Sequence, residues 1–507
     1  MKTHSKLSSS ILALLGSIAI SHAETVTWDG TTSGDAIWTD ADSNSWSGGQ
    51  YDNGDDTQFL GAGAGTVTLS GTITPNSVLV NSANDYDFTG VLSGGGSLTK
   101  DGSGILTLSS DMTYTGGTTV NGGELQLDSG DGTLQSGTTL TIDGDSSVVR
   151  LGPTVSGNNI FGSGALFIQN GGTMIDDTPG GAVHSINNGL TFTNGGSLTS
   201  TGVGNGTYGN YYFGGGSGIN VTGNAAATIS ADSISITNGR TITVADVTGD
   251  ANADLTISSV IRNSNSATVV NKYGAGTLAL TTQNTHTGGT TVFDGTLDLV
   301  GQNILFGNGS NNNSALTVDG SSSLVKLSAT GINAMNTIGP LTLKNGGTFT
   351  DNGPAGGLHS VYAPVIFDGG GTMTSEVTGN GGFGNFLFIN GIQVTSTTGL
   401  ATIDAHSISF NFSQTLDVAD SVAGSGTDLL ISSSIRNERV GTITKNGTGK
   451  VTLSGTNVDT SAWAINDGSL EVQNGSAIGD AAAVTVNSGG AFEVDNAETI
   501  GRIGGAG

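Results

Sequence analysis

The stretch KDGSGILTLSSDMTYTGGTTVNGGELQL, residues 100–127, alternates short apolar runs with glycine-rich turns, and it recurs twice further along the chain. Its counterparts are KYGAGTLALTTQNTHTGGTTVFDGTLDL, from Lys272, and KNGTGKVTLSGTNVDTSAWAINDGSLEV, from Lys445. All three copies share K-x-G-x-G, two short apolar segments and a closing G-x-L-x-[LV]. Such self-similarity at a long interval is typical of repeat architectures, in which stacked units share one continuous core.

Aliphatic residues recur in every copy with a period of two, while the residues between them vary among Thr, Ser, Ala, Glu and Lys. This alternation predicts strands with one buried face and one wet face. The residues expected to point inward are Leu106, Leu108, Val120, Leu125 and Leu127 in the first copy, Leu278, Leu280, Val292, Leu297 and Leu299 in the second, and Val451, Leu453, Ile465, Leu470 and Val472 in the third.

Glycines and one lysine complete the motif. A glycine ahead of the last strand indicates a corner with positive φ or a close backbone approach. Each lysine either binds a ligand or, as we favour, is solvated at a strand edge, where charge discourages lateral pairing. These motif residues are Lys100, Gly102, Gly104, Gly116, Gly117 and Gly123, then Lys272, Gly274, Gly276, Gly288, Gly289 and Gly295, and finally Lys445, Gly447, Gly449 and Gly468.

The sequence between the copies is duplicated as well. TLTIDGDSSVVRL (139–151) matches ALTVDGSSSLVKL (315–327), and DLTISSVIRN (254–263) matches DLLISSSIRN (428–437). The two duplicated stretches differ by insertions of a few residues, and these fall between the strands because loops tolerate changes in length. We therefore divide the chain into five parts: a signal peptide (1–23), a cap region (24–90), a first full module (91–265), a second full module (266–438) and a truncated third module (439–507).

Strands of three to five residues bury little alone, but they form a continuous aliphatic column when stacked as coils. We predict an all-β fold, a right-handed parallel β-helix with coils of about 20–25 residues. A sandwich would need longer strands and more aromatic residues. Three of the four tryptophans, Trp28, Trp38 and Trp46, lie in the first region and predict an N-terminal cap, with a glycan site as the alternative.

The N-terminal sequence and the overall composition point to an exported protein. Lys2 and Lys6 precede the apolar run ILALLGSIAI (11–20), and SHA (21–23) suits cleavage after Ala23. No later segment is long and apolar enough to span a membrane as a helix. The net charge of −27 disfavours nucleic acid and anionic lipid as partners. The chain has no cysteine, so extensive backbone pairing must take the place of disulfides.

The motif K-x-G-x-G-x-L-x-L…[YH]-T-G-G-T-T-V-x-x-G-x-L-x-L resembles the passenger-associated transport repeat, also called the autotransporter-associated β-strand repeat. The copy at 445–472 departs from it, because DTSAWAI replaces YTGGTTV. The resemblance implies a β-helical passenger of a secreted or surface-displayed bacterial protein, in which the repeat is thought to help folding and export. It defines a scaffold rather than an activity.

Three kinds of chemical site could use the acidic and histidine residues, and turn chemistry is the competing explanation for the first. DANAD (250–254) begins like a calcium loop but lacks the glycine and the final acid, and the second module reads GSGTD there. DADSN (40–44) is no closer. We assign these acids to turns, and predict no metal, cofactor or catalytic residue.

Histidines give the second candidate. His184 and His359 are equivalent in the duplication, whereas His286 replaces Tyr114 and His406 replaces Asp232. We interpret the paired positions as architectural.

A polysaccharide-active enzyme is the third, because β-helices host lyases and hydrolases. It would need several acids and a base in one groove, whereas the acids here are spread singly over turns. We therefore expect a structural, adhesin-like scaffold without catalysis, as a monomeric rod or part of a longer passenger. Its possible partners are surface glycans or surface proteins. A polysaccharide-active enzyme and a calcium- or glycan-binding module remain the alternatives.

Overall fold

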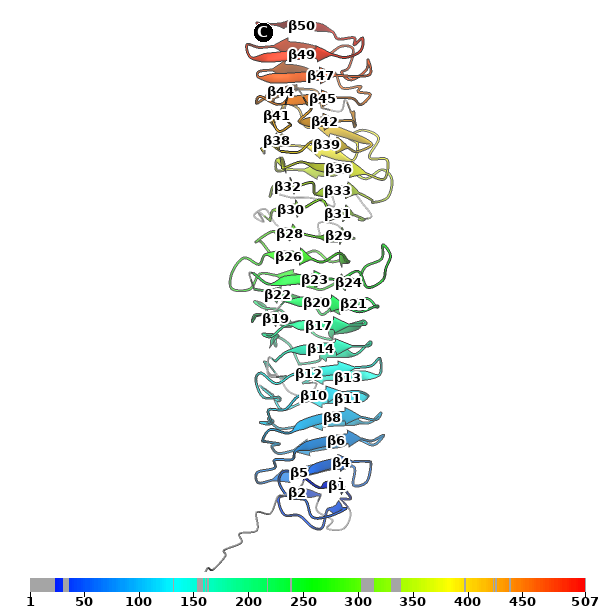
Figure 1. The fold of residues 1–507 in the computed structure, drawn as a ribbon, viewed down its shortest axis with the longest axis vertical. Helices are drawn as coiled ribbons and strands as arrows, with labels where there is room; N and C mark the ends of the chain where they lie inside the picture. Colours follow the sequence, from blue (N-terminus) through cyan, green and yellow to red (C-terminus); the bar gives the residue numbers. More distant parts are fainter. Residues whose placement is uncertain are drawn as a thin grey trace, which may run out of the picture.

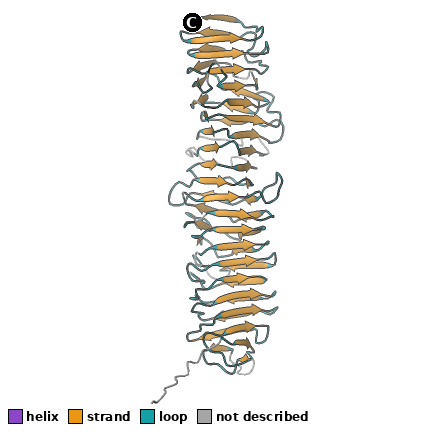
Figure 2. Cartoon of the chain, viewed as in Figure 1, coloured by secondary structure: helices purple, strands orange, loops and turns teal. Residues whose placement is uncertain are grey.

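The computed structural model is a long rod of stacked coils whose regular structure consists of strands (Figures 1 and 2). It describes residues 23–30, 36–130, 132–152, 158–159, 161, 164–216, 218–237, 239–301, 314–329, 339–395, 398–422, 424, 426–436 and 439–506. The prediction of an all-β parallel solenoid is confirmed.

Two long ladders of parallel strands run the length of the rod, and each coil contributes one strand to each ladder. The first ladder comprises β1 (Thr25–Trp28), β4 (Asp56–Phe59), β6 (Ser77–Asn81), β8 (Ser97–Asp101), β10 (Thr118–Val120), β12 (Leu140–Asp143), β14 (Leu166–Gln169), β17 (Leu190–Thr193), β20 (Ile219–Thr222), β23 (Thr241–Val244), β26 (Val270–Tyr273), β28 (Thr290–Val292), β30 (Leu316–Asp319), β32 (Leu341–Lys344), β35 (Val365–Asp368), β38 (Ile392–Val394), β41 (Gln414–Val418), β44 (Thr442–Asn446), β46 (Ala462–Ile465), β48 (Ala483–Val486) and β50 (Arg502–Gly505), with β3 (Trp46–Ser47) antiparallel to β1.

The second ladder lies beside the first and carries the other strand of each coil. It comprises β2 (Ile37–Thr39), β5 (Gly65–Ser70), β7 (Tyr86–Thr89), β9 (Ile105–Leu108), β11 (Gly123–Leu127), β13 (Ser147–Leu151), β15 (Thr173–Asp176), β18 (Gly196–Ser200), β21 (Ala227–Ser230), β24 (Leu255–Ile257), β27 (Thr277–Leu280), β29 (Gly295–Leu299), β31 (Ser323–Leu327), β33 (Thr348–Asp351), β36 (Gly371–Ser375), β39 (Ala401–Asp404), β42 (Leu429–Ile431), β45 (Lys450–Leu453), β47 (Gly468–Val472) and β49 (Gly490–Val494).

Two four-stranded sheets add a third strand to some coils of each full module. The first short sheet comprises β16 (His184–Ser185), β19 (Tyr211–Phe213), β22 (Ser233–Ile236) and β25 (Val260–Arg262). The second short sheet comprises β34 (His359–Val361), β37 (Phe386–Phe388), β40 (Ser407–Phe410) and β43 (Ser434–Ile435). The duplication seen in the sequence therefore recurs as two equivalent three-stranded regions.

Alternation along each strand builds the core. Within the first ladder, Val80, Lys100, Val120 and Ile142 occupy one inward column in register, and the aliphatic members are at most 1% exposed. Burying one such aliphatic side chain stabilises the fold by about 1.5–3 kcal/mol. Because every coil adds one residue to the column, the core continues through the rod.

An aromatic cluster closes the N-terminal end. Trp28, Trp38 and Trp46 are at most 6% exposed and pack against Phe59 with ring centroids 5.4–5.6 Å apart. Strand β3 also pairs with β1 and so protects the edge of the first ladder. The rings serve as the predicted cap, and their burial removes them from any glycan surface.

Asparagines occupy a corner column that follows the first ladder. Asn194 Nδ2 donates to Asn170 Oδ1 at 2.9 Å, and Asn170 Nδ2 donates to Asp143 Oδ1 at 2.6 Å. Asn170 and Asn194 have φ of +50° and +58°. Asparagine tolerates this left-handed conformation better than most residues, so the corner chemistry selects it.

Two predictions from the sequence stay open. Strand pairing in both ladders continues on either side of the proposed module boundaries at residues 90/91, 265/266 and 438/439. The modules therefore remain units proposed from the sequence repeat. The predicted signal peptide lies outside the described residues except for Ala23. Within the described ranges, the structure contains no helix with the length and apolarity needed to cross a membrane.

Candidate functional site

The three motif copies fold in the same way, and each spans two successive coils, of which the first, from the lysine to the next strand of its ladder, we call the motif coil or repeat coil. Each copy contains two strands of the first ladder and two of the second: β8 to β11, β26 to β29 and β44 to β47. The lysine pairs in register with the aliphatic residue twenty positions later, as for Lys100 with Val120. By comparison, Leu190 pairs with Ile219 in a three-stranded coil. All fifteen aliphatic positions named above are at most 1% exposed.

The motif lysines are buried, and our interpretation of them as solvated edge residues is wrong. Lys100, Lys272 and Lys445 are 1%, 0% and 0% exposed. The strand pattern explains why: in β8 the inward residues are Leu98 and Lys100, two positions apart. The alkyl stem therefore continues the aliphatic column, and the ammonium group lies inside the corner of the coil.

Each ammonium group donates to three backbone carbonyl oxygens. Lys100 Nζ lies 2.9 Å from Asp101 O, 2.9 Å from Gly102 O and 3.0 Å from Gly122 O. The first two oxygens belong to its own corner, and the third belongs to the corner of the next coil. The lysine thus ties two successive coils together at one point.

The other two copies repeat this geometry. Lys272 Nζ lies 3.4, 2.5 and 2.8 Å from the carbonyl oxygens of Tyr273, Gly274 and Asp294. Lys445 Nζ lies 3.0, 2.5 and 3.0 Å from the three corresponding oxygens. We call this arrangement the lysine staple.

Burial sets the electrostatics of the staple. Loss of hydration lowers the pKa of Lys100, Lys272 and Lys445 to about 8, although nearby aspartates act in the opposite direction. At neutral pH the ammonium form still predominates, and its three N–H groups match three acceptors. The charged ammonium group therefore serves as a donor to backbone carbonyl oxygens inside the coil.

Glycine is required at the corner that faces the staple. Gly123, Gly295 and Gly468 have φ of +65°, +65° and +64°. A Cβ on Gly123 would lie 2.5 Å from Gly102 O and 2.8 Å from Lys100 Nζ. Both reasons considered from the sequence, positive φ and close approach, therefore apply at this corner.

The remaining motif glycines differ in how strictly they are needed. A Cβ on Gly104 would meet Asn84 O at 2.5 Å, and one on Gly116 would meet Gly96 O at 2.2 Å. Gly117 has no contact closer than 3.7 Å to its virtual Cβ, and Ala462 occupies that position in the third copy. Within the run TGGTT of the first copy, Gly116 has no room for a side chain, whereas the position of Gly117 can accept one.

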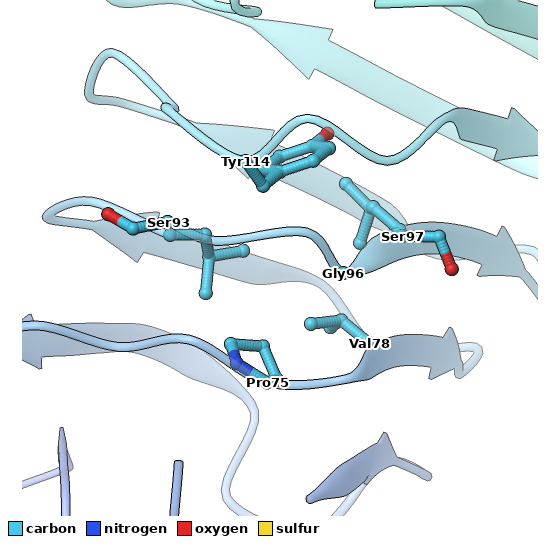
Figure 3. A pocket seen from close by; sticks show the side chains of 8 residues that line it. Pro75, Val78, Ser93, Gly96, Ser97 and Tyr114 are labelled. Carbon is cyan, nitrogen blue, oxygen red and sulfur yellow. The ribbon is translucent and has the colours of Figure 1, made fainter. Parts of the chain in front are cut away.

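The variable position of the motif fills the side of the coil opposite the staple. Tyr114 is 4% exposed, and its hydroxyl forms a 2.6 Å hydrogen bond with Thr118 Oγ1. Figure 3 shows its ring above Ser93, Gly96 and Ser97 of the preceding coil. The pocket beneath has a volume of ≈ 10 Å³, enough for about one water molecule. It is a packing gap.

In the third copy the large and the small side chain have changed places between two positions of the motif. Asp459 stands where Tyr114 does, and Trp463 stands where Thr118 does. Trp463 is 3% exposed, so the indole supplies the volume that the tyrosine supplies in the first copy. Asp459 accepts hydrogen bonds from Ser461 N and Oγ at 3.1 and 2.9 Å. Volume-conserving exchange explains how this copy departs from the motif and keeps the coil.

His286 holds this position in the second copy and forms a 3.0 Å hydrogen bond with Thr290 Oγ1. Burial lowers its pKa to about 4. The unfolded chain, with an ordinary pKa of about 6.5, binds a proton first as the pH falls, so folding stability should drop between pH 6.5 and 4 by about 3 kcal/mol. We expect His286→Tyr, which installs the residue of the first copy, to abolish this part of the pH dependence, measured as urea midpoints at pH 7 and 4.5.

The exposed His406 provides the control for that prediction. His406→Tyr should leave the difference between the two urea midpoints unchanged. Equal pH dependence in wild type and His286→Tyr would show that His286 takes up a proton as readily in the folded chain as in the unfolded one.

The acid shared by the two modules in the calcium-like stretch accepts backbone hydrogen bonds. Asp254 Oδ1 accepts from Val247 N and Thr248 N, both at 2.8 Å, and Oδ2 accepts from Thr277 N at 2.7 Å. Its equivalent, Asp428, accepts from Ser421 N, among others. This explains why only the last acid of DANAD persists in the second module: it closes a loop. Within the described ranges, no group of three or more His, Cys, Asp or Glu residues is placed to hold a metal ion.

A buried polar network was missed by sequence reasoning. His184 Nε2 lies 3.3 Å from Asp176 Oδ1, and Asn210 Nδ2 donates to Asp176 Oδ2 at 2.8 Å. Burial raises the pKa of Asp176, but its contacts with His184, Thr178 and Asn210 outweigh this and lower the pKa overall. Asp176 and His184 are 2% and 0% exposed, so the network is closed to substrates.

The second module repeats the network. His359 Nε2 lies 3.3 Å from Asp351 Oδ1, and Asn385 Nδ2 donates to Asp351 Oδ2 at 2.8 Å. The shared spacing of aspartate, histidine and asparagine in both modules was the available signal. The two copies of the network link coils within the three-stranded regions.

Two surface grooves lie among the described residues. One, of ≈ 400 Å³, is lined by Asp111, Met112, Thr113, Gly132, Leu134, Gln135, Ser136 and Asn159. The other, of ≈ 460 Å³, is lined by Gly206, Thr207, Val260, Arg262, Asn263, Gln283 and Thr285. Among the described residues that line the two grooves, Asp111 supplies the only carboxylate, whereas a polysaccharide-cleaving site would need several acids with a base.

These features define a parallel β-solenoid in which a compact two-stranded coil with a buried lysine recurs three times. A family model described as the passenger-associated-transport-repeat matches residues 98–127, 270–299 and 443–472. The chain therefore carries three passenger-associated transport repeats, and these repeats together with the β-solenoid fold support an autotransporter passenger scaffold. No curated protein and no solved structure matches the chain.

Proposed function

We propose that the protein is an exported, surface-displayed scaffold with an adhesin-like role, in which the three repeat coils aid folding after export. The observation that carries this proposal is the recurrence of the lysine staple in every copy of the transport repeat. The proposed partners are surface glycans or surface proteins, and the proposed role requires no catalysis.

The physical argument concerns how a chain folds after it crosses a membrane unfolded. A motif coil closes over only twenty residues, whereas the three-stranded coils close over up to thirty, as between Ile242 and Lys272. Shorter loops cost less entropy to close, and local contacts form faster. The staple then satisfies three carbonyl groups at one corner. Each repeat coil can thus offer a formed edge on which the next coil pairs.

The surface chemistry supports display outside the cell. Among the described residues three lysines and seven aspartates are buried, so most of the acids of the chain lie on its surface in large excess over the bases. A net charge of −27 favours solubility and resists lateral association of the rods.

Export is tested by expressing the full chain in a bacterial secretory host and sequencing the N-terminus of the recovered protein. We expect a start at Glu24, together with recovery from the periplasm, medium or cell surface. A chain retained in the cytoplasm with its first 23 residues intact would contradict the proposal. Replacing Leu14 and Leu15 by arginine, which interrupts the apolar run, is the matched control and should prevent export.

A further inference from the structure

The groove beside Arg262 has ordered walls. One wall is a turn that folds over the first short sheet, residues 205–209, closed by the bridge between Asn205 and Gly209. We call this turn the flap. The opposite wall is the loop of the second repeat coil, which supplies Gln283 and Thr285. Strand β25 forms the floor between them. The groove thus lies where a compact repeat coil follows a larger three-stranded coil.

Side-chain contacts hold the flap in place. Ser235 Oγ donates to Tyr208 O at 2.7 Å, and Arg262 Nη1 donates to Gly206 O at 3.3 Å. The rings of Tyr208 and Tyr212 pack with centroids 4.8 Å apart. The groove is therefore preorganised, which reduces the entropy cost of binding a ligand.

The charges around the groove are balanced. Arg262 Nη2 lies 3.7 Å from Asp232 Oδ2, so a carboxylate already offsets the guanidinium group. The remaining lining is neutral, and the chain as a whole carries −27. An anionic ligand would meet long-range repulsion and find no uncompensated cation. A neutral ligand is therefore favoured.

The lining groups match a polyhydroxyl ligand. Thr207 and Thr285 carry hydroxyl groups toward the groove, Gln283 carries an amide, and Val260 provides an apolar patch. The amide of Asn263 is hydrogen-bonded to Thr268 and Thr287 and shapes the wall rather than binding the ligand. Amides and hydroxyls can both donate and accept, as sugar hydroxyls do. We propose that this groove binds a neutral oligosaccharide chain. The inference builds on the proposed scaffold function and assigns it a ligand class and a site.

The second module shows a different surface at the equivalent place. Its flap, residues 380–384, is held by the same contact, since Ser409 Oγ donates to Phe383 O at 2.7 Å. There, however, the guanidinium of Arg439 packs 5.6 Å from the Phe383 ring and 5.1 Å from the Phe412 ring. Since Arg439 stands where the first module has Asn265, the two flaps are chemically distinct, and we expect one saccharide site per chain.

The test is a titration of the purified mature chain, monitored by calorimetry and NMR. The neutral ligands are maltohexaose, cellohexaose and chitohexaose, and trigalacturonate is the anionic comparison. We expect at least one neutral hexasaccharide to bind with a 1:1 stoichiometry and a Kd on the order of 0.1–1 mM. Gln283→Ala should weaken binding about five- to tenfold, and Thr207→Trp should block the groove.

Gln135→Ala, in the other groove, is the matched control and should leave the Kd unchanged. Absence of binding by every neutral hexasaccharide at about 10 mM, exclusive binding of trigalacturonate, or equal Kd values for wild type and Gln283→Ala would each overturn the assignment. Because the assay uses folded protein in solution, a negative result leaves the proposed export and scaffold function standing. Failed export would equally leave the saccharide site testable.

Discussion

Lys272→Met is expected to destabilise the second repeat coil by about 3 kcal/mol. The methionine keeps the aliphatic stem but removes the donor that serves Tyr273 O, Gly274 O and Asp294 O. Leaving a buried acceptor unpaired costs about 1–3 kcal/mol. Relief of the desolvated charge, whose pKa of about 8 corresponds to about 3 kcal/mol, offsets only part of that loss. Hydrogen exchange over residues 270–299 measures the result.

The control is Lys344→Met, because the Lys344 side chain is 41% exposed and its Nζ lies 3.9 Å from Asp319. A surface pair of this kind contributes about 0–1 kcal/mol. Equal protection loss in both variants would show that the lysine staple adds nothing beyond an ordinary surface lysine. Combining Lys100→Met, Lys272→Met and Lys445→Met should affect three separate coils, and the local losses should add because the sites are far apart.

The sequence predicted the coil well because its signal is periodic. Leu106 and Leu108, then Leu125 and Leu127, alternate strictly, and repetition in three copies separates this pattern from chance. A period of two places alternate residues on one face without knowledge of any long-range contact. The same argument would have placed Lys100 inward, since it lies two residues after Leu98. A lysine at an inward position can be buried when its alkyl stem packs in the core and its ammonium group finds backbone acceptors, so position outweighs residue type here.

The polar networks could not be derived in the same way. Asp176 and Asn210 lie 34 residues apart, and their contact depends on which coils stack and in what register. Insertions of a few residues between strands alter that register without leaving a periodic trace. The flap groove is hidden for the same reason, since Gly206 and Arg262 are 56 residues apart. Local periodicity thus predicts the coil, whereas contacts between coils need the assembled structure.

Gly295→Ala should be among the most damaging small substitutions in the motif, with a loss of more than about 3 kcal/mol. Gly295 has φ of +65°, which costs an L-residue about 1–2 kcal/mol. Its Cβ would also lie 2.4 Å from Gly274 O and 2.6 Å from Ala275 C, backbone atoms that cannot move without disturbing the lysine corner. The free energy of unfolding of the coil, from hydrogen exchange at residues 270–299, gives the measurement.

Two glycines of the same chain separate the conformational cost from the steric one. Gly181 has φ of +83° and nothing within 4 Å of its virtual Cβ, so Gly181→Ala should cost only about 1 kcal/mol. Gly117 has neither a positive φ nor a contact closer than 3.7 Å, so Gly117→Ala should be neutral or stabilising by up to about 1 kcal/mol. If Gly295→Ala costs no more than Gly181→Ala, then close packing against the corner is not what requires glycine there. The graded order is expected because the corner at Gly295 combines both constraints beside the buried lysine.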